Sequence, residues 1–225
     1  MRPPDTSADT ITPLPADLAA ALPGTFIVFD GPDGSGKSTQ LERFAAACRA
    51  SGIDPVHVRE PGGTLLGERL RDLLLAHTDE PIDVHAEMLL YMASRAQLVR
   101  QRIAPALAEG RFVLADRFVS STLAYQGTAG GLDPDHIRAV AQIACGNSMP
   151  DLTVIFDVDE QTANSRLSPL LDRMEAKGAA FHKRVRVGYL DQIKQDPDHY
   201  ARIDATRDVD AVTSDLVRTL QERLA

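Results

Sequence analysis

Short runs of apolar residues alternate along the chain with longer segments in which apolar residues recur every three or four positions. The runs cover residues 26–29, 56–58, 112–115 and 152–156, and a fifth is expected near residues 200–203. Continuous rather than alternating apolarity is typical of strands that are buried on both faces, as in a parallel sheet. The pattern therefore predicts five parallel strands.

Helical spacing is found between these runs. It covers residues 38–50 and 84–108, and a closing helix is expected through Leu216, Leu220 and Leu224. Alternation of strands and helices builds right-handed βαβ units, in which helices cover both faces of the sheet. We expect a three-layer α/β sandwich that forms a single domain over residues 25–225, with ligands at the carboxyl ends of the strands.

The first 24 residues differ in composition from the rest. They combine five prolines with three aspartates: Pro3, Pro4, Pro13, Pro15, Pro23, Asp5, Asp9 and Asp17. A secretory signal needs a basic start and an apolar segment, and a transit peptide is poor in acidic residues. We interpret residues 1–24 as a disordered or loosely attached extension.

Charge and cysteine content narrow the possible partners. The formal net charge of −8 argues against a protein that coats nucleic acid or an anionic membrane, so a phosphate ligand would need a local cluster of arginines. Cys48 and Cys145 lie far apart and form no CxxC pair, which is typical of reduced thiols in a cytosolic protein. No apolar run reaches the ~18 residues of a membrane span. We expect a cytoplasmic protein that binds neither nucleic acid nor membrane.

A glycine-rich segment directly follows the first predicted strand. Residues 31–38 read GPDGSGKS, which matches the phosphate-loop pattern G-x-x-x-x-G-K-[ST]. Glycines allow successive backbone N–H groups to face a phosphate, and the following helix adds its positive end. Lys37 would contact the outer phosphates and Ser38 would bind Mg²⁺. The segment predicts a nucleoside triphosphate site, whether in a kinase, a switch or a motor. Its candidate residues are Gly31, Asp33, Gly34, Ser35, Gly36, Lys37, Ser38 and Thr39.

A second group of polar residues follows the second and third predicted strands. Arg71 comes after the turn at residues 59–64, and Asp116 and Arg117 end the third run. Arginine holds phosphate through its planar fork, and a carboxylate at a strand end is well placed to hold Mg²⁺ directly or through water. Tyr91 and Arg95 share a helix face. These residues suit a second, smaller anion that carries a base. The base would stack on an aromatic ring, and Arg95, Thr122 and Gln126 would contact its polar edges.

Plainer interpretations compete at several of these positions. An alternative interpretation of Tyr91 is a core aromatic residue on a long helix. Arg69 is better explained as a solvated helix charge than as a ligand. Glu60 either orients Arg59 or a magnesium-bound water, or forms an ordinary salt bridge within its turn.

Over residues 25–224 the ordered motifs resemble those of the thymidylate kinase family. They are GPDGSGKST, REPGGT, YMASRAQ, DRF followed by SSTLAYQG, PDLTVIFDV, and LDRMEAKGAAFHKRVRVGYL. The resemblance implies a P-loop kinase fold with a short lid at about residues 166–174, and Mg²⁺-dependent transfer of phosphate from ATP to dTMP. It also implies a cytoplasmic homodimer, for which the helix at 84–108 offers a contact face.

The resemblance also implies roles for single residues. Asp33 would bind the sugar 3′-hydroxyl of the monophosphate, and Arg71 and Arg117 would hold its phosphate. Tyr91 would stack on thymine. Arg95, Thr122 and Gln126 would recognise the base, and the adenine of ATP would lie near Ala205 and Thr206.

The arginine that assists transfer is less plainly assigned. Family members carry it either within the phosphate loop, where this chain has Gly34, or in the lid, where Leu170 stands at a position that is commonly arginine. We expect Arg166 to supply the charge, with Arg173 as a substitute. Two alternatives to a dTMP kinase remain open. One is a kinase for another pyrimidine monophosphate such as dUMP, and the other is a catalytically weakened nucleotide-binding regulator.

Overall fold

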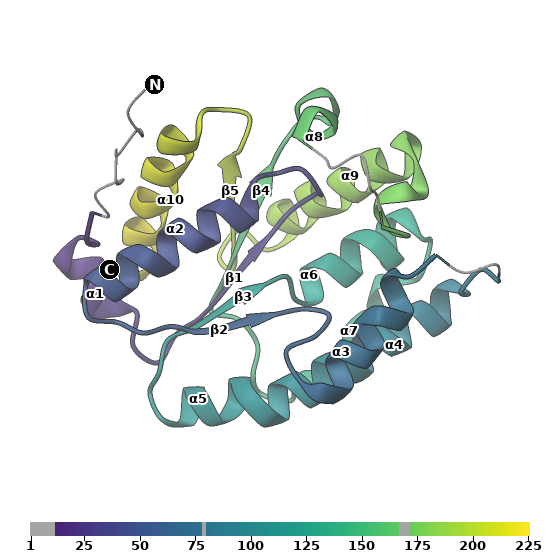
Figure 1. Cartoon of the computed structure of the whole chain (residues 1–225), viewed down its shortest axis with the longest axis horizontal. Coiled ribbons are helices and arrows are strands. Elements are labelled where there is room, and N and C mark those ends of the chain that lie inside the picture. Colours follow the sequence, from purple (N-terminus) through teal and green to yellow (C-terminus); the bar gives the residue numbers. More distant parts are fainter. Residues whose placement is uncertain (1–11, 78–79, 167–171) are drawn as a thin grey trace, which may run out of the picture.

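Five parallel strands form one sheet at the centre of the molecule (Figure 1). The computed structural model describes residues 12–77, 80–166 and 172–225. The strands are β1 (Phe26–Asp30), β2 (Val56–Arg59), β3 (Val113–Asp116), β4 (Leu152–Asp157) and β5 (Tyr200–Asp204), in the order β2-β3-β1-β4-β5. Every neighbouring pair is parallel. The predicted α/β class and the five predicted strands are confirmed.

Burial along the strands explains the strength of each sequence signal. Every residue of β1 and β4 is buried, whereas in β2 and β5 exposed residues alternate with buried ones. β2 and β5 are the edges of the sheet. Edge strands face solvent more than central ones, so their apolar runs are shorter and less distinct.

One face of the sheet is covered by α1 (Ala16–Ala21), α2 (Lys37–Ala50) and α10 (Val209–Leu224). The core on this face includes Phe29, Phe44 and Phe156, whose rings pack in tilted and edge-on contacts. Figure 1 shows α2 and α10 side by side above the sheet.

The N-terminal segment contributes to this core. Leu18 and Leu22 are fully buried and Leu14 nearly so, and the Leu14 N–H donates to Ser51 Oγ at 2.8 Å. The prediction of a loosely attached segment is therefore wrong for residues 14–22. The three leucines are spaced by four residues, but only Leu18 lies within α1, so the segment is too short to give a clear helical signal beside its prolines. Residues 1–11 lie outside the described part of the chain.

The opposite face carries α3 (Leu65–Leu75), α4 (Val84–Leu98), α5 (Ala104–Ala108), α7 (Pro134–Cys145) and α9 (Ala179–Gln195). The helix predicted at 84–108 consists of α4, a π-helical turn at Val99–Ile103 and α5. Pro105 lacks an N–H for the regular helical ladder, and the wider turn precedes it.

Shorter helical segments complete the fold near the carboxyl edge of the sheet. They are α6 (Val119–Thr122), the π-helical Leu123–Ala129, α8 (Glu160–Arg166) and the 3₁₀ turn Glu175–Lys177. Residues 167–171 of the predicted lid are outside the described ranges. Within those ranges, no helix combines the length and the apolarity that crossing a membrane requires.

Both cysteines are buried free thiols on helices, as predicted. Burial raises the pKa of Cys48 to about 12 and that of Cys145 to about 11. Neither thiol is activated for chemistry.

Candidate active site

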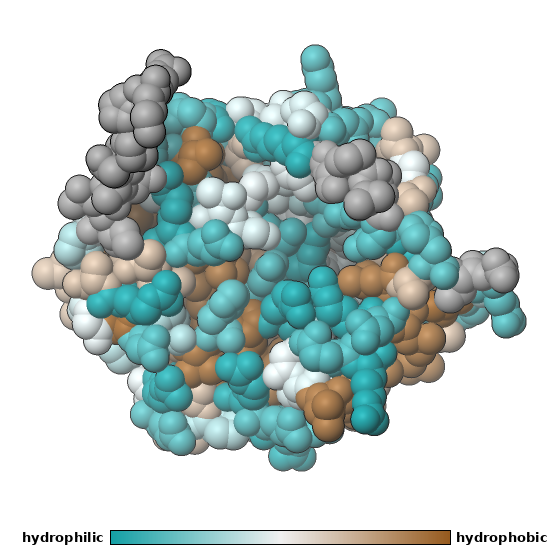
Figure 2. All heavy atoms as spheres, viewed as in Figure 1, coloured by the Kyte–Doolittle hydropathy of each residue, from teal (hydrophilic) through white to brown (hydrophobic). Residues whose placement is uncertain are grey.

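Two hollows meet at the carboxyl edge of the sheet. The larger has a volume of about 510 Å³ and follows the phosphate loop, and the smaller, of about 230 Å³, lies beside it. Asp33, Lys37 and Ser38 line both. In Figure 2 hydrophilic residues (teal) surround the hollow near the centre of the face shown. Two ligands bound in these hollows would therefore meet above the start of α2.

The phosphate loop is held against β4 and α8. Gly31 has φ +145, and a Cβ there would lie 2.5 Å from the Phe156 carbonyl oxygen; at Gly34 (φ +76) it would lie 2.4 Å from that of Ala163. Glycine is needed at both positions for its backbone angle and for close approach. Except for Gly31, the predicted loop residues line the larger hollow: Asp33, Gly34, Ser35, Gly36, Lys37, Ser38 and Thr39.

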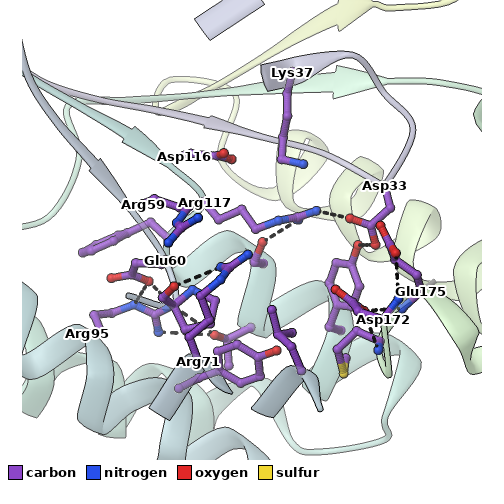
Figure 3. Close-up of a pocket in the computed structure, with 18 of the residues that line it drawn as sticks. Asp33, Lys37, Arg59, Glu60, Arg71, Arg95, Asp116, Arg117, Asp172 and Glu175 are labelled. Atoms are coloured by element: carbon purple, nitrogen blue, oxygen red, sulfur yellow. Dashed lines mark hydrogen bonds and ion pairs between the residues drawn. The ribbon is translucent and has the colours of Figure 1, made fainter. Parts of the chain in front are cut away.

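Lys37 and Asp116 lie together where the two hollows meet (Figure 3). Burial lowers the pKa of the Lys37 ammonium, and the neighbouring Arg117 adds to the effect. Oδ1 of Asp116 is buried and has no hydrogen-bond partner. An oxygen left in this way at a strand end is suited to a cation or to an ordered water.

Arg117 occupies the floor of the smaller hollow and has a constrained backbone. Its φ of +70 is in the left-handed region that non-glycine residues rarely adopt. Its guanidinium donates to the Gly31 carbonyl and Ser121 Oγ, both at 3.0 Å, and pairs with Asp33. The side chain is thereby directed toward the phosphate loop.

Asp33 connects the loop to the smaller hollow. The Tyr125 hydroxyl donates to its carboxylate at 2.7 Å. Burial opposes ionisation of Asp33, but the charges of Arg117 and Lys37 outweigh it and lower the pKa of this carboxyl. The group is a carboxylate and accepts hydrogen bonds.

The two arginines of α3 differ in their surroundings. Arg71 lines the smaller hollow and donates to the Pro61 carbonyl at 3.0 Å. Arg69 is exposed and lines neither hollow, in agreement with its interpretation as a solvated charge.

The base-reading candidates of the sequence all line the smaller hollow: Tyr91, Arg95, Thr122 and Gln126. Tyr91 is half-buried there and is not part of the core clusters, and burial raises the pKa of its hydroxyl. The alternative of a core aromatic residue is therefore wrong for Tyr91.

Arg95 is fully buried and ion-paired with Glu60. Nε and one NH₂ group contact Glu60 Oε2 at 2.7 and 2.6 Å, and both terminal nitrogens donate to Thr122 Oγ1 at 3.2 Å. Burial raises the pKa of Glu60 to about 7, against the opposing charge of Arg95. The prediction that Glu60 orients Arg59 is wrong, since Arg59 pairs with Glu68.

Arg166 lies beside the larger hollow at the end of α8 and donates to the Ala205 carbonyl at 2.8 Å. Thr206 bonds to Asp204 and does not line the hollow, although its neighbours Ala205 and Arg207 do. Sequence reasoning placed the adenine at this turn but missed Arg207.

Arg173 contacts residues outside the larger hollow. It pairs with Glu87 at 2.7 Å, and its Nε donates to the Leu74 carbonyl, also at 2.7 Å. The expectation that Arg173 substitutes for Arg166 is not supported by this position. Leu170 lies outside the described residues.

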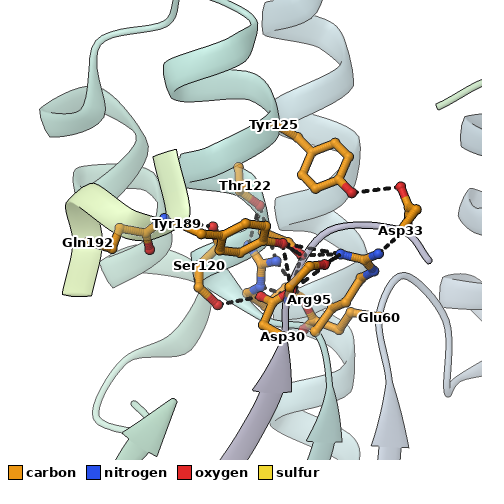
Figure 4. Close-up of polar contacts among 12 residues, drawn as sticks. Asp30, Asp33, Glu60, Arg95, Ser120, Thr122, Tyr125, Tyr189 and Gln192 are labelled. Atoms are coloured by element: carbon orange, nitrogen blue, oxygen red, sulfur yellow. Dashed lines mark hydrogen bonds and ion pairs between the residues drawn. The ribbon is translucent and has the colours of Figure 1, made fainter. Parts of the chain in front are cut away.

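A buried polar network under Arg117 was also missed. Asp30 accepts from the hydroxyls of Ser120, Ser121 and Tyr189, and Arg117 pairs with it (Figure 4). The signal was present, since Asp30 ends β1 and the serines follow β3 at the same edge of the sheet.

Comparison with known proteins identifies the family of the chain. The family model described as thymidylate kinase matches residues 29–216. A thymidylate kinase of an Exiguobacterium species is 42% identical over 90% of this chain and 97% of its own length, and that of Pseudomonas syringae pv. tomato is 43% identical over 90% and 98%. The crystal structure of thymidylate kinase from Ehrlichia chaffeensis has a TM-score of 0.71 and 31% identity, covering 88% of this chain and 99% of that one. The chain belongs to the thymidylate kinase family.

Proposed function

We propose that the protein transfers the terminal phosphoryl group of ATP to the phosphate of dTMP, giving ADP and dTDP. The observation that carries this proposal is the junction of two hollows at Asp33, Lys37 and Ser38. The larger hollow follows the phosphate loop. The smaller one is lined by arginines and by the residues that are candidates for binding a base. Alignment of two anionic ligands is most of what phosphoryl transfer requires.

On the donor side, the backbone of residues 31–39 would cradle the phosphates of ATP. Lys37 would place its charge on the outer phosphates, and the adenine would rest near Ala205 and Thr206. Arg166 would reach the transferred group from α8. Its contact with Ala205 and its place on the larger hollow support this role.

Mg²⁺ would be held by the Ser38 hydroxyl and the Asp116 carboxylate. The fit is supported by the buried, unpartnered Oδ1 of Asp116, because a hard cation takes oxygen ligands. When bound with ATP, the ion neutralises charge on the phosphate oxygens.

On the acceptor side, Arg71 and Arg117 would hold the phosphate of dTMP, and Asp33 would accept from the sugar 3′-hydroxyl. Tyr91 would stack on thymine, while Arg95, Thr122 and Gln126 would contact its polar edge. The buried Glu60–Arg95 pair fixes one of these groups in advance.

In the reaction, an oxygen of the acceptor phosphate forms a bond to the γ-phosphorus of ATP. The bond from that phosphorus to the bridging oxygen breaks, and ADP leaves with the electron pair. Lys37, Arg117 and Arg166 would stabilise negative charge on the moving group, as cationic side chains do in this class of reaction.

An assay of ADP release with a panel of monophosphates tests the proposal. We expect dTMP to give the highest kcat/KM among dTMP, dUMP, dCMP and the purine monophosphates. A higher kcat/KM for dUMP would make dUMP the proposed acceptor in place of dTMP. Binding of ATP and dTMP without ADP release would favour the weakened regulator.

Arg71 and Arg69 provide a matched pair of variants on one helix. Arg71→Ala should raise the KM for dTMP by ~10-fold or more, because a charge-assisted contact to phosphate is lost. Arg69→Ala should leave the KM unchanged, since Arg69 lines neither hollow. Equal effects of the two variants would contradict the placement of the acceptor phosphate.

We further propose a homodimer that works in the cytoplasm. Leu89 on α4 and Leu65, Leu66 and Leu73 on the adjoining α3 are exposed, and Figure 2 shows hydrophobic residues (brown) at the right of the face, over these helices. Sedimentation equilibrium tests the dimer. The cytoplasmic location is supported by ATP as the proposed donor and by the two free thiols.

A further inference from the structure

Glu87 is a buried carboxylate that joins three separate segments. It lies in the first turn of α4, is 1% exposed, and accepts from Gln126 Nε2 at 2.7 Å. It also pairs with Arg173 at 2.7 Å and with Lys177 at 3.2 Å. Neither the phosphate loop nor the candidate magnesium ligands involve it, so its burial needs another explanation.

The contact between Glu87 and Gln126 fixes the orientation of an amide. A carboxylate paired with two cations only accepts hydrogen bonds, so the amide must present its nitrogen to it. Rotation of the amide by half a turn would place two oxygens in contact. Because Nε2 is bound to Glu87, Oε1 is the amide atom that can accept a hydrogen bond from a ligand in the smaller hollow, which Gln126 lines.

An amide oxygen discriminates between pyrimidines. Thymine and uracil carry an N–H donor at ring position 3, whereas cytosine carries an unprotonated acceptor there. A hydrogen-bond acceptor fixed in the protein pairs with the N–H of thymine or uracil but is left unpaired when cytosine binds. Buried sites that are built to pair with a polar group reject analogues that lack it.

The two cations on Glu87 extend this arrangement toward the lid. Arg173 Nε donates to the Leu74 carbonyl at the end of α3, and Lys177 closes the 3₁₀ turn. Asp172, Met174 and Glu175 of this segment line the smaller hollow. One carboxylate thus holds both the amide of Gln126 and the segment that borders the hollow.

We propose that Glu87 is a positioning residue that fixes Gln126 with its oxygen toward the acceptor base, and thereby favours pyrimidines with an N–H at position 3 over cytosine. The inference rests on the proposed function, because it assumes that the smaller hollow binds the acceptor nucleotide. Glu87 itself contacts no substrate.

The variant Glu87→Gln tests the proposal at nearly constant volume. The new amide is able to donate to Oε1 of Gln126, so both orientations of Gln126 become possible. We expect the ratio of kcat/KM for dTMP over dCMP to fall by ~10-fold and the KM for dTMP to rise by a similar factor. The KM for ATP should stay within about twofold, because the donor hollow is not involved.

Asp157→Asn is a matched control. Asp157 is also a buried carboxylate that pairs with two cations, Arg186 and Arg202, and it lines neither hollow. This variant should lower the Tm and leave the dTMP over dCMP ratio unchanged. If Glu87→Gln lowers the Tm in the same way without changing the ratio, Glu87 is only structural and the proposal is overturned.

A second variant keeps the test decisive if Glu87→Gln does not fold. Glu87→Asp keeps a carboxylate but shortens the side chain by one methylene group, which lengthens the 2.7 Å contact with Gln126. The ratio should again fall, and an unchanged ratio would overturn the proposal. Activity of the wild-type protein distinguishes failure of the proposed function from failure of the proposed role of Glu87. No phosphorylation of dTMP refutes the proposed function, whereas normal phosphorylation with an unresponsive ratio refutes the role of Glu87 alone.

Discussion

Arg117 combines an unfavourable backbone angle with a dense set of partners. A φ of +70 costs a non-glycine residue on the order of 1–2 kcal/mol. The side chain is nonetheless fixed by Asp30, Asp33, Ser121 and Tyr189. Strained residues persist where the surroundings determine their geometry and are concentrated at functional sites. The angle therefore supports a functional role for Arg117.

Replacement of Arg166 by alanine tests the source of transition-state charge. We expect kcat to fall by ~10³-fold with little change in the KM for either substrate, as for removal of an arginine that acts in cis. Steady-state kinetics measures both constants. Arg218→Ala on the exposed side of α10 is the control and should be neutral. A near-normal kcat for Arg166→Ala would remove this assignment.

Glu60 should make stability depend on pH. Burial raises the pKa of Glu60 in the folded state to about 7 from its ordinary value of 4.5, so the folded state binds the proton more tightly than the unfolded state. The free energy of unfolding should fall as the pH rises from about 4.5 to about 7. Urea unfolding at several pH values measures this slope, and Glu60→Gln should make it flatter. A slope that is the same in both proteins would show that Glu60 does not titrate in this range.

At the scale of elements, the phosphate loop and α8 are in direct contact. A Cβ at Gly34 would lie 2.4 Å from the carbonyl oxygen of Ala163 in α8. A side chain as large as arginine at this position would therefore displace α8. Arg166, the proposed source of the charge, ends α8 and lines the larger hollow.

Gly34→Ala should therefore impair the donor site. The added methyl group meets backbone, and the φ of +76 is unfavourable for alanine. We expect the affinity for ATP to fall by ~10-fold or more, measured by calorimetry. Gly52→Ala is the control, because it has a similar φ of +80 but no atom within 4 Å, and it should leave ATP affinity unchanged.

At the scale of the whole molecule, the first and last helices of the described residues pack together. α1 contacts α10, and Gln221 donates to the Asp17 carboxylate at 3.0 Å. Figure 1 shows α1 beside the C-terminus. The segment that precedes the first strand therefore completes the core on that face of the sheet.

Leu18→Ala should lower the free energy of unfolding by about 2–5 kcal/mol, because it leaves a cavity in a fully buried site. The same variant should keep the wild-type kcat/KM, since α1 lines neither hollow. Denaturant unfolding provides the measurement. Ile143→Ala, at an 85% exposed position, should change the stability by less than about 0.5 kcal/mol. A Leu18 variant as stable as Ile143→Ala would contradict the packing of α1.

Several features followed from local pattern alone. Continuous apolar runs predicted the central strands because a parallel sheet buries both faces, and the glycine spacing predicted the phosphate loop because its backbone angles need that residue. The partners of Glu60 and Arg173 could not be predicted in this way. Arg95 and Glu87 lie far from them in sequence, and only the packing of α4 brings them into contact.

By itself the sequence determined the α/β class, the position of the phosphate loop and which residues gather at the carboxyl edge of the sheet. These depend on short-range periodicity and on the rule that parallel strands end at one edge. The tertiary structure alone decided that residues 14–22 join the core, that Glu60 pairs with Arg95, and that Glu87 links Gln126 to the segment after the lid. Those contacts join residues distant in sequence, and no local pattern encodes which buried charges meet.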